Sequence, residues 1–290
     1  MPNKVKVLCD TSCDLPAQLA ESRGILVLPA LVIFNSELFR EGVDISVDAF
    51  YDRLQQGLVP STSQIGPADF APFFRAAVAD GSEAVYIGLS SGLSGSTGNA
   101  EQVAAELGGG VRVVDSLSAS MGAGLMVLKA ADLADEGLSA DAIVAELIRY
   151  REQVCHAFTL DTLEFARRSG RITRLSAIAA GVLDIKPVLN IDMEGRLEPL
   201  DKVRGRKRAL NRVCDEIDRL GADLHGKRAA LSHAHDRETA AALAERLRTE
   251  YGAAEVVVGE IGANIGSHVG PGCIAIFFEG PAGRGYAPQS

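Results

Sequence analysis

The fold is decided first by the stretch KVKVLCDTSCDLP, residues 4–16. Polar and apolar residues alternate from Lys4 to Cys9, which is typical of a β-strand, and the strand closes on the turn and cap residues of Asp10-Thr11-Ser12. Leu15-Pro16 then predicts the first turn of a helix, a position where proline is favoured. The chain therefore begins with a strand that runs into a helix.

The same alternation of strands and helices continues through the first half of the chain. Further strands are predicted at residues 25–34, 84–89 and 111–114, and helices at 46–56, at 67–80, after Ser94 and onward to Tyr150. Strands separated by helices are typical of a mainly parallel sheet with right-handed crossovers. Residues 1–155 are therefore predicted to form an N-terminal, doubly wound, Rossmann-like α/β domain.

The pattern changes in the second half. Residues 185–191 and 196–203 flank a turn at Met193-Glu194-Gly195 and predict a β-hairpin. Strands at 228–233, 255–258 and 272–279 and a helix at 237–249 are predicted after it. Residues 156–283 are thus predicted to form a C-terminal mixed α/β domain with antiparallel pairing, followed by a frayed Gly/Pro tail.

Composition narrows the functional classes. The 290 residues are 47% hydrophobic and 23% charged, which is typical of a folded globular protein. The net charge of -9 disfavours nucleic acid as a partner, and the basic residues between Lys202 and Arg212 are interpreted as a solvated helix face. Five scattered cysteines do not resemble a disulfide framework. Because no signal peptide or membrane-spanning run is found, we expect a cytoplasmic protein without stable membrane insertion.

A Ser/Gly-rich loop, Gly88 to Ser96, follows a predicted strand and opens a helix. Free N–H groups at such a position favour a phosphate or a carboxylate, but the lysine of a nucleotide-binding loop is missing. The loop also matches Gly-x-Ser-x-Gly, and Ser90, Asp115 and His268 follow the chain order of a hydrolase triad. An enzyme that uses Ser90 to Ser96 on a small phosphorylated or carboxylated metabolite, or as a serine hydrolase, is therefore the alternative hypothesis.

Other polar segments leave several interpretations open. Pro60 to Gln64 is predicted as a loop whose hydroxyls converge with the Ser/Gly loop on one carboxylate. Arg171 and His268 lie in Gly-flanked loops, where an ion pair or a structural hydrogen bond explains them equally well. His233 and His235, with Asp236 beside them, would allow a metal pair, but a third ligand is not evident and strand-end polar residues are the preferred interpretation. No metal and no cofactor is expected.

Seven stretches together resemble the DegV family of bacterial fatty-acid-binding proteins, and they occur in the family's order. They are Asp10 to Pro16, Ser61 to Gln64, Ser90 to Gly95, Val114 to Ser116, Gly170 to Ile172, Ile185 to Pro187 and His268 to Gly272. Any one of these stretches is a weak signal. The ordered set is specific and spans nearly the whole chain.

The resemblance implies a function and a division of roles. In this family a long-chain fatty acid such as palmitate lies in an apolar tunnel between the two domains. Thr62 and Ser94 match the positions that hold its carboxylate, within motifs that also contain Ser63, Ser91 and Gly92. Arg171 and His268 match the positions that act when the acid is presented to a separate fatty acid kinase, which makes an acyl-phosphate for phospholipid synthesis. The chain itself is expected to be a non-catalytic lipid carrier.

Overall fold

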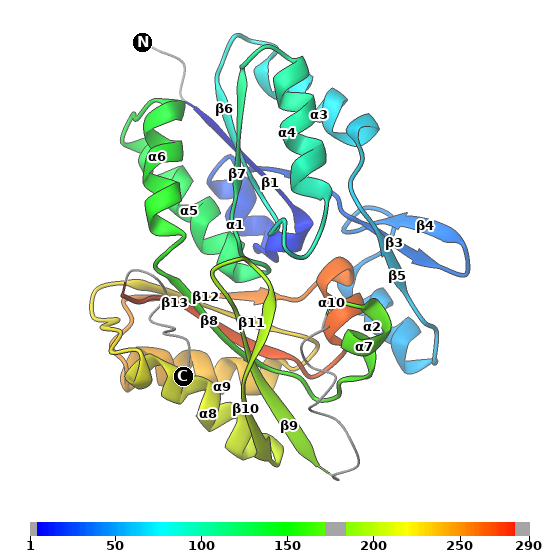
Figure 1. Cartoon of the computed structure of the whole chain (residues 1–290), viewed down its shortest axis with the longest axis vertical. Helices are drawn as coiled ribbons and strands as arrows, with labels where there is room; N and C mark the ends of the chain where they lie inside the picture. Colours follow the sequence, from blue (N-terminus) through cyan, green and yellow to red (C-terminus); the bar gives the residue numbers. More distant parts are fainter. Residues whose placement is uncertain (1–4, 172–183, 282–290) are drawn as a thin grey trace.

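The computed structural model describes residues 5–171 and 184–281, which form three β-sheets and their covering helices (Figure 1). Lys4 of the predicted first strand, Ile172 and the tail from residue 282 lie outside the described residues. None of the helices in the described ranges combines the length and apolar character needed to cross a bilayer.

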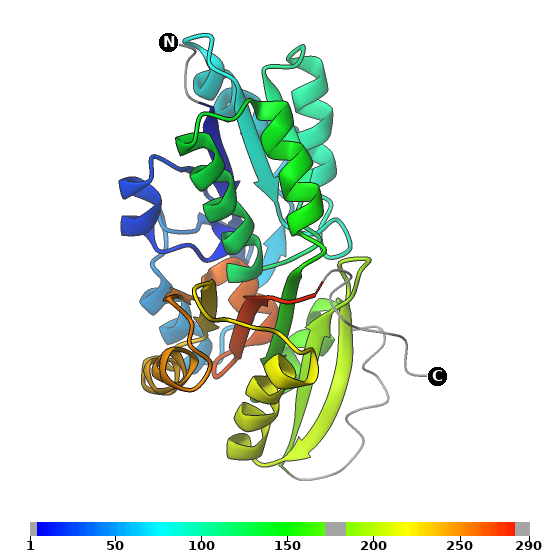
Figure 2. The same ribbon diagram turned by 90° about the vertical axis from the view of Figure 1, so that its left-hand side faces the viewer.

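The first sheet has four parallel strands in the order β2-β1-β6-β7. The strands are β1 (Lys6–Asp10), β2 (Leu26–Leu28), β6 (Ala84–Gly88) and β7 (Val111–Asp115). Helices α3 (Pro67–Val78) and α4 (Ser96–Glu106) cover one face, and α5 (Met121–Asp135) and α6 (Ala140–Tyr150) cover the other (Figure 2). Successive side chains of β1 point to opposite faces of the sheet, so Leu8 packs with α3 and α4 while Val7 and Cys9 pack with α5. The prediction of a doubly wound parallel sheet is confirmed.

The second sheet has six strands in the order β10-β9-β8-β13-β11-β12. They are β8 (Val154–Thr159), β9 (Ile185–Ile191), β10 (Leu197–Arg204), β11 (Arg228–His233), β12 (Glu255–Glu260) and β13 (Ile274–Glu279). Only β11 and β12 pair in parallel, so this sheet is mixed, as predicted, and the predicted hairpin is β9–β10. Helices α8 (Arg206–Arg219) and α9 (Arg237–Thr249) pack on one face of it (Figure 1).

Helix α5 lies between the two large sheets. It contacts β1 and β6 of the first sheet and β8, β11 and β13 of the second. Its sequence is rich in Ala, Gly, Leu and Met, and nearly every residue from Met121 to Ala134 is buried. A helix whose residues are nearly all apolar is stable only where it is enclosed, and α5 belongs to the shared core of both sheets.

A small third sheet corrects the predicted strand at 25–34. Pro29 separates β2 from β3 (Leu31–Phe34), and β3 joins β4 (Glu37–Arg40) and β5 (Ser61–Ser63) in the order β4-β3-β5. The hairpin turn at Asn35 and Ser36 has positive φ at both residues. The segment predicted as a polar loop, Ser61 to Ser63, is therefore an edge strand.

Short helices complete the structure. They are the 3-10 turn η1 (Thr11–Cys13), α1 (Ala17–Ser22), α2 (Val47–Gln55), α7 (Glu164–Ser169) and α10 (Ala263–Val269). The prediction of a loop around His268 was wrong, because this residue lies in α10 and the loop begins only at Gly270. Arg171 follows the left-handed Gly170 that ends α7.

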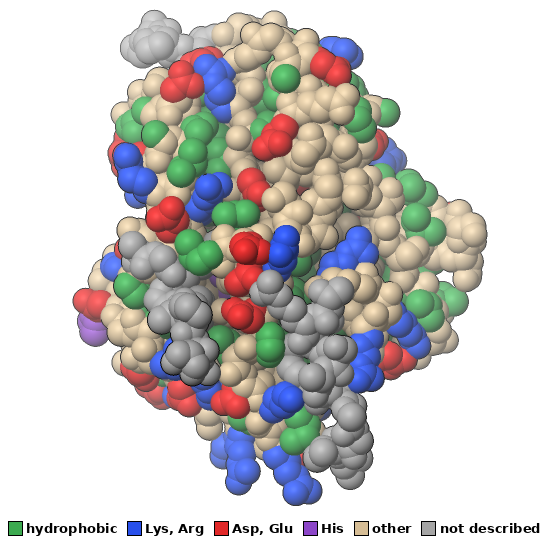
Figure 3. Space-filling view, viewed as in Figure 1, with side chains coloured by type: hydrophobic (Ala, Val, Ile, Leu, Met, Phe, Trp, Pro, Cys, Tyr) green, Lys and Arg blue, Asp and Glu red, His purple; other side chains and the backbone are tan. Residues whose placement is uncertain are grey.

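Two of the basic residues at the end of β10 and the start of α8 form ion pairs that join neighbouring elements. Arg212 contacts both Asp201 and Glu216, and Arg206 contacts Asp236. Lys and Arg side chains also gather at the lower end of the face in Figure 3, where Figure 1 shows α8 and the β9–β10 hairpin. Lys202, Arg204, Lys207 and Arg208 are exposed, which agrees with the interpretation of a solvated, charged face.

Candidate functional site

A pocket lies where the three sheets approach one another. It has an empty volume of about 960 Å³, a value that includes open solvent at its mouth. Most of its walls are apolar and come from both large sheets, α10 and the loop after β6; they include Leu89, Leu93, Phe158, Ile191, Leu197, Ile265, Val269 and Phe277. The pocket therefore suits a ligand that is mainly hydrocarbon.

Two of the predicted residues form a polar pair on the pocket wall. The Oγ1 atom of Thr62 lies 3.0 Å from Nε2 of His268. Thr62 is placed by β5, where it pairs with Val32 of β3, and His268 is placed by α10, which packs against both strands. Residues separated by 206 positions in the chain are thus brought into hydrogen-bonding contact.

The Ser/Gly loop brings a second set of hydroxyls to the pocket. Ser94 Oγ lies 3.0 Å from Ser96 Oγ, and Ser96 Oγ accepts a hydrogen bond of 3.1 Å from the backbone N–H of Ile65. Gly95 permits this approach, because a Cβ there would lie 2.6 Å from Oε1 of Gln64. The two predicted hydroxyl clusters do converge, with Ser63 also in the pocket lining.

The surroundings of His268 favour its neutral form near pH 7. Burial, and secondarily the positive charge of Arg171, lowers the pKa of His268 to about 4. Its Nδ1 atom is buried and has no hydrogen-bond partner within the described ranges. Arg171 is itself exposed, and its Nη1 donates to Ser169 O at 2.6 Å. Of the described residues that line the pocket, Arg171 is the one with a permanent positive charge.

Polar groups that sequence reasoning assigned only to capping also reach the pocket. Asp10 is 2% exposed; its Oδ1 accepts from the N–H of Ser12 and its Oδ2 from the hydroxyl of Tyr86, at 2.8 and 2.5 Å. Burial raises the pKa of Asp10 despite these bonds. Ser12 and Ser120 line the pocket with it. Their contribution was not foreseen, because Asp10 and Ser12 look like ordinary strand-end residues.

Close to Asp10, two further buried carboxyl groups join the ends of η1 and β4 to the start of α10. Asp14 Oδ1 accepts from the N–H of Gly262 at 2.9 Å, and Glu41 Oε2 accepts from the N–H of Asn264 at 3.1 Å. Burial raises the pKa of Glu41 to about 7 and that of Asp14 well above its usual range. These groups position α10, and hence His268, relative to the first sheet.

The structure does not bring the remaining predicted residues to the pocket wall. Ser91 is exposed, and its N–H donates to Asp115 Oδ1 at 3.2 Å. Gly92 packs against the β9–β10 turn, where a Cβ would lie 2.7 Å from Glu194 O. Both stand near Ser94 in the chain but face away from the pocket lining.

The hypothetical triad is not assembled. Ser90 is fully buried, and its hydroxyl donates to Gly195 O at 2.7 Å. Asp115 accepts from the backbone N–H groups of Ser91 and Leu117, and His268 contacts Thr62 instead of Ser90. A nucleophile needs a base within hydrogen-bond reach, and Ser90 has none among its described contacts.

Taken together, the doubly wound sheet, the mixed sheet, the small third sheet and the pocket where they meet define an α/β protein built around an apolar ligand site with a polar hydroxyl and imidazole cluster. The chain matches, over residues 4–280, the model described as an uncharacterised protein of the DegV family. The chain belongs to the DegV family.

Relatives with solved structures share the whole fold. A DegV family protein from Thermus thermophilus, described by its fatty acid binding, is 33% identical, and the match covers 96% of this chain and 100% of that one with a TM-score of 0.89. DegV from Bacillus subtilis, described as a fatty acid binding protein, is 28% identical over 96% of this chain and 99% of that one, with a TM-score of 0.85. A DegV domain-containing protein from Deinococcus radiodurans is 35% identical over 277 residues, 95% of this chain and 98% of the relative.

Proposed function

We propose that this chain is a non-catalytic carrier that holds a long-chain fatty acid in the pocket and offers its carboxylate to a separate fatty acid kinase. The observation that carries the proposal is the apolar pocket with the Thr62–His268 pair on its wall. The fatty acid binding described for the relatives from Thermus thermophilus and Bacillus subtilis supports the choice of ligand.

The tail supplies most of the binding free energy. Each CH₂ group removed from water contributes roughly 0.8 kcal/mol, so a long acyl chain is retained without a strong head-group interaction. Walls such as Phe158, Ile191 and Phe277 provide the apolar surface for it. The polar cluster then needs only to orient the carboxylate and replace part of its hydration.

The Thr62–His268 contact indicates the tautomer of His268 and the direction in which the Thr62 hydroxyl donates. If Nδ1 of His268 carried the proton, a buried N–H would have no partner among the described residues, whereas an unpaired acceptor at this position costs less. We therefore infer the tautomer with the proton on Nε2, which donates to Thr62 Oγ1. The Thr62 hydroxyl hydrogen is then free to donate to the carboxylate, together with Ser94.

Arg171 is the group proposed to act when the acid is handed over. It lines the pocket, yet it is exposed, so its guanidinium is reachable by a second protein. A planar cation suits the phosphate-bearing transition state of acyl-phosphate formation. The kinase would supply ATP and the catalytic groups, and the acyl-phosphate would enter phospholipid synthesis in the cytoplasm.

Two experiments test the proposal in sequence. Organic extraction of the purified protein, followed by mass spectrometry, should release a fatty acid, and the delipidated protein should bind one again on titration. With a purified fatty acid kinase and ATP, Arg171→Ala should lower acyl-phosphate formation while binding is retained. Arg168→Ala is the matched control, because Arg168 is an exposed arginine of α7 that pairs with Glu164 and does not line the pocket.

The outcomes separate the two parts of the proposal. A protein that yields no fatty acid and binds none on titration contradicts the carrier function. Binding with equal transfer rates for Arg171→Ala, Arg168→Ala and the parent protein contradicts only the role of Arg171.

A further inference from the structure

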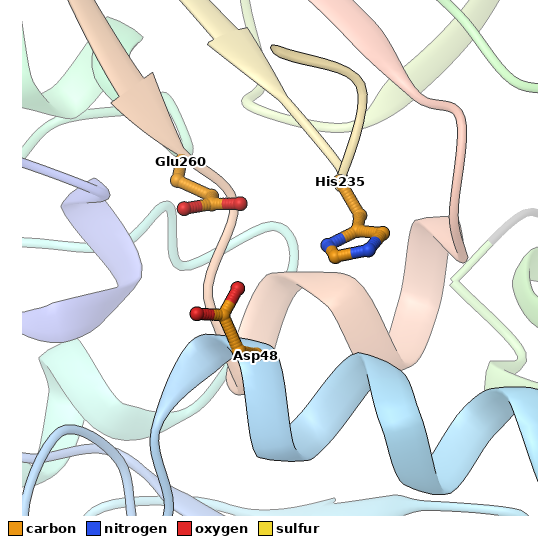
Figure 4. A group of neighbouring side chains, drawn as sticks. All are labelled: Asp48, His235 and Glu260. Carbon is orange, nitrogen blue, oxygen red and sulfur yellow. The ribbon is translucent and has the colours of Figure 1, made fainter.

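Three potential metal ligands from separate elements meet outside the fatty acid pocket (Figure 4). Asp48 lies in α2, His235 follows β11 and Glu260 ends β12. One ligand atom of each lies within 4.8 Å of the other two, and none of the three residues lines the pocket. The site is therefore distinct from the polar cluster at Thr62.

The imidazole of His235 is held in place by neighbouring groups. Its ring stacks on that of Tyr51, with centroids 5.3 Å apart and planes inclined by 24°. Tyr51 is buried, and its hydroxyl donates to Ile261 O at 2.9 Å. Ile261 is the residue after Glu260. The segment that carries Glu260 therefore also fixes Tyr51, on which His235 stacks.

Glu260 has an unsatisfied oxygen. Its Oε1 atom is buried and has no hydrogen-bond partner within the described ranges, while Oε2 accepts from Arg237 Nη2 at 2.9 Å. A buried carboxylate oxygen without a donor is costly, and a cation that engaged both oxygens of Glu260 would remove that cost.

We propose that Asp48, His235 and Glu260 bind a divalent transition-metal ion of the zinc type. An imidazole nitrogen with two carboxylates suits this class better than Ca²⁺ or Mg²⁺, which prefer oxygen ligands alone. Ligands of one tetrahedral zinc ion lie roughly 3.4 Å apart, given bonds of about 2.0 to 2.2 Å, so the set must close by about an ångström. Asp48 is exposed and can move toward the ring of His235, which is held by its stack on Tyr51.

Arg237 is the internal competitor of the metal ion. One of its nitrogens, Nη2, lies 3.0 Å from Asp48 Oδ1 and 2.9 Å from Glu260 Oε2, so it occupies the space between the two carboxylates. Its side chain is 63% exposed and can therefore turn into solvent without losing much packing. Arginine supplies the positive charge when the metal is absent, and the metal replaces it when bound.

Metal binding would involve helix α2, which lies next to an element of the fatty acid site. Helix α2, which carries Asp48, packs against α10, which carries His268. A metal bridge from α2 to the ends of β11 and β12 would raise the thermal stability of this region.

The test uses the full-length protein after treatment with a chelator. Zn²⁺ titration by calorimetry should show one ion per chain, and Co²⁺ should give the visible absorption bands of a protein-bound ion. His235→Gln should weaken Zn²⁺ binding roughly tenfold or more, whereas Arg237→Gln should tighten it by removing the competitor. His225→Gln is the matched control, since His225 is an exposed histidine that contacts Asp223 elsewhere on the surface.

Three results would overturn the proposal. They are no Zn²⁺ binding by the parent protein, equal affinity for His235→Gln and His225→Gln, or weaker binding in Arg237→Gln. His235 and Arg237 are exposed, so their variants should fold, and circular dichroism checks this directly.

Discussion

Replacing Thr62 with valine tests the proposed head-group contact most directly. Valine has nearly the shape of threonine and the same β-branch, so the pairing of Thr62 with Val32 in the third sheet is kept. What the substitution removes is the hydroxyl that contacts His268 Nε2 at 3.0 Å and that we propose donates to the carboxylate.

The expected magnitude follows from one hydrogen bond to a charged acceptor. Such a bond is worth about 1.5 to 3 kcal/mol, which corresponds to a roughly 10- to 150-fold weaker affinity for the fatty acid. His268 loses its partner in the free and the loaded protein alike, so that loss cancels in the binding equilibrium. It appears instead as a fall of about 1 kcal/mol in the free energy of unfolding.

The assay is displacement of a fluorescent fatty acid from the delipidated protein, with Thr62→Ser as the control that keeps a hydroxyl. Thr62→Ser should bind within a few-fold of the parent protein, and Thr62→Val should show the full loss. The reasoning is refuted if Thr62→Val binds as tightly as Thr62→Ser, or if both variants lose affinity equally.

Three further predictions concern groups around the site. Ser90→Ala should cost about 1 kcal/mol of stability through the lost bond to Gly195 O but leave fatty acid affinity unchanged, and labelling of Ser90 by a serine-directed reagent would favour the hydrolase alternative. Burial raises the pKa of Glu41 from 4.5 to about 7. Protonation of Glu41 therefore stabilises the folded state, by on the order of 3 kcal/mol, and this contribution is fully present below about pH 4.5. It is lost as the pH rises through 7. Denaturant unfolding at several pH values should therefore show a flatter profile in Glu41→Gln than in the parent protein. Because the pKa of His268 lies near 4, fatty acid affinity should show no step between about pH 6 and 8, and a step that disappears in His268→Asn would contradict this.

Local periodicity predicted much of the fold because it reports which residues face a core. The hairpin at 185–203 and the parallel strands after 84 and 111 each follow from patterns within one segment. The break at Pro29 was missed because the residues on both sides are equally apolar. Strand pairing separates the two segments, because Leu26 to Leu28 pairs with β1 and Leu31 to Ile33 pairs with β5. A pairing partner more than ten residues away cannot be predicted from the local sequence pattern.

Helix α10 was missed for a related reason. Its seven residues contain Gly266 and lie between Gly262 and Gly270, a composition typical of a loop. The helix is supported by tertiary contacts, because Asp14 and Glu41 accept from the N–H groups of Gly262 and Asn264. Intrinsic propensity is too weak to predict a helix that depends on such distant carboxylates.

Contacts between distant residues could not be predicted for the candidate site either, and one of them bears on how the head group would be held. The residue types pointed to an anion, and the family resemblance assigned Thr62 to holding it and His268 to presenting it. Neither source contained the 3.0 Å contact between them. If Nε2 of His268 donates to Thr62, the direction of the Thr62 hydroxyl depends on where the imidazole lies. Under the proposed function, a kinase that displaced His268 on docking would therefore also weaken the proposed contact of Thr62 with the carboxylate, and holding and release of the head group would be coupled through this one hydrogen bond.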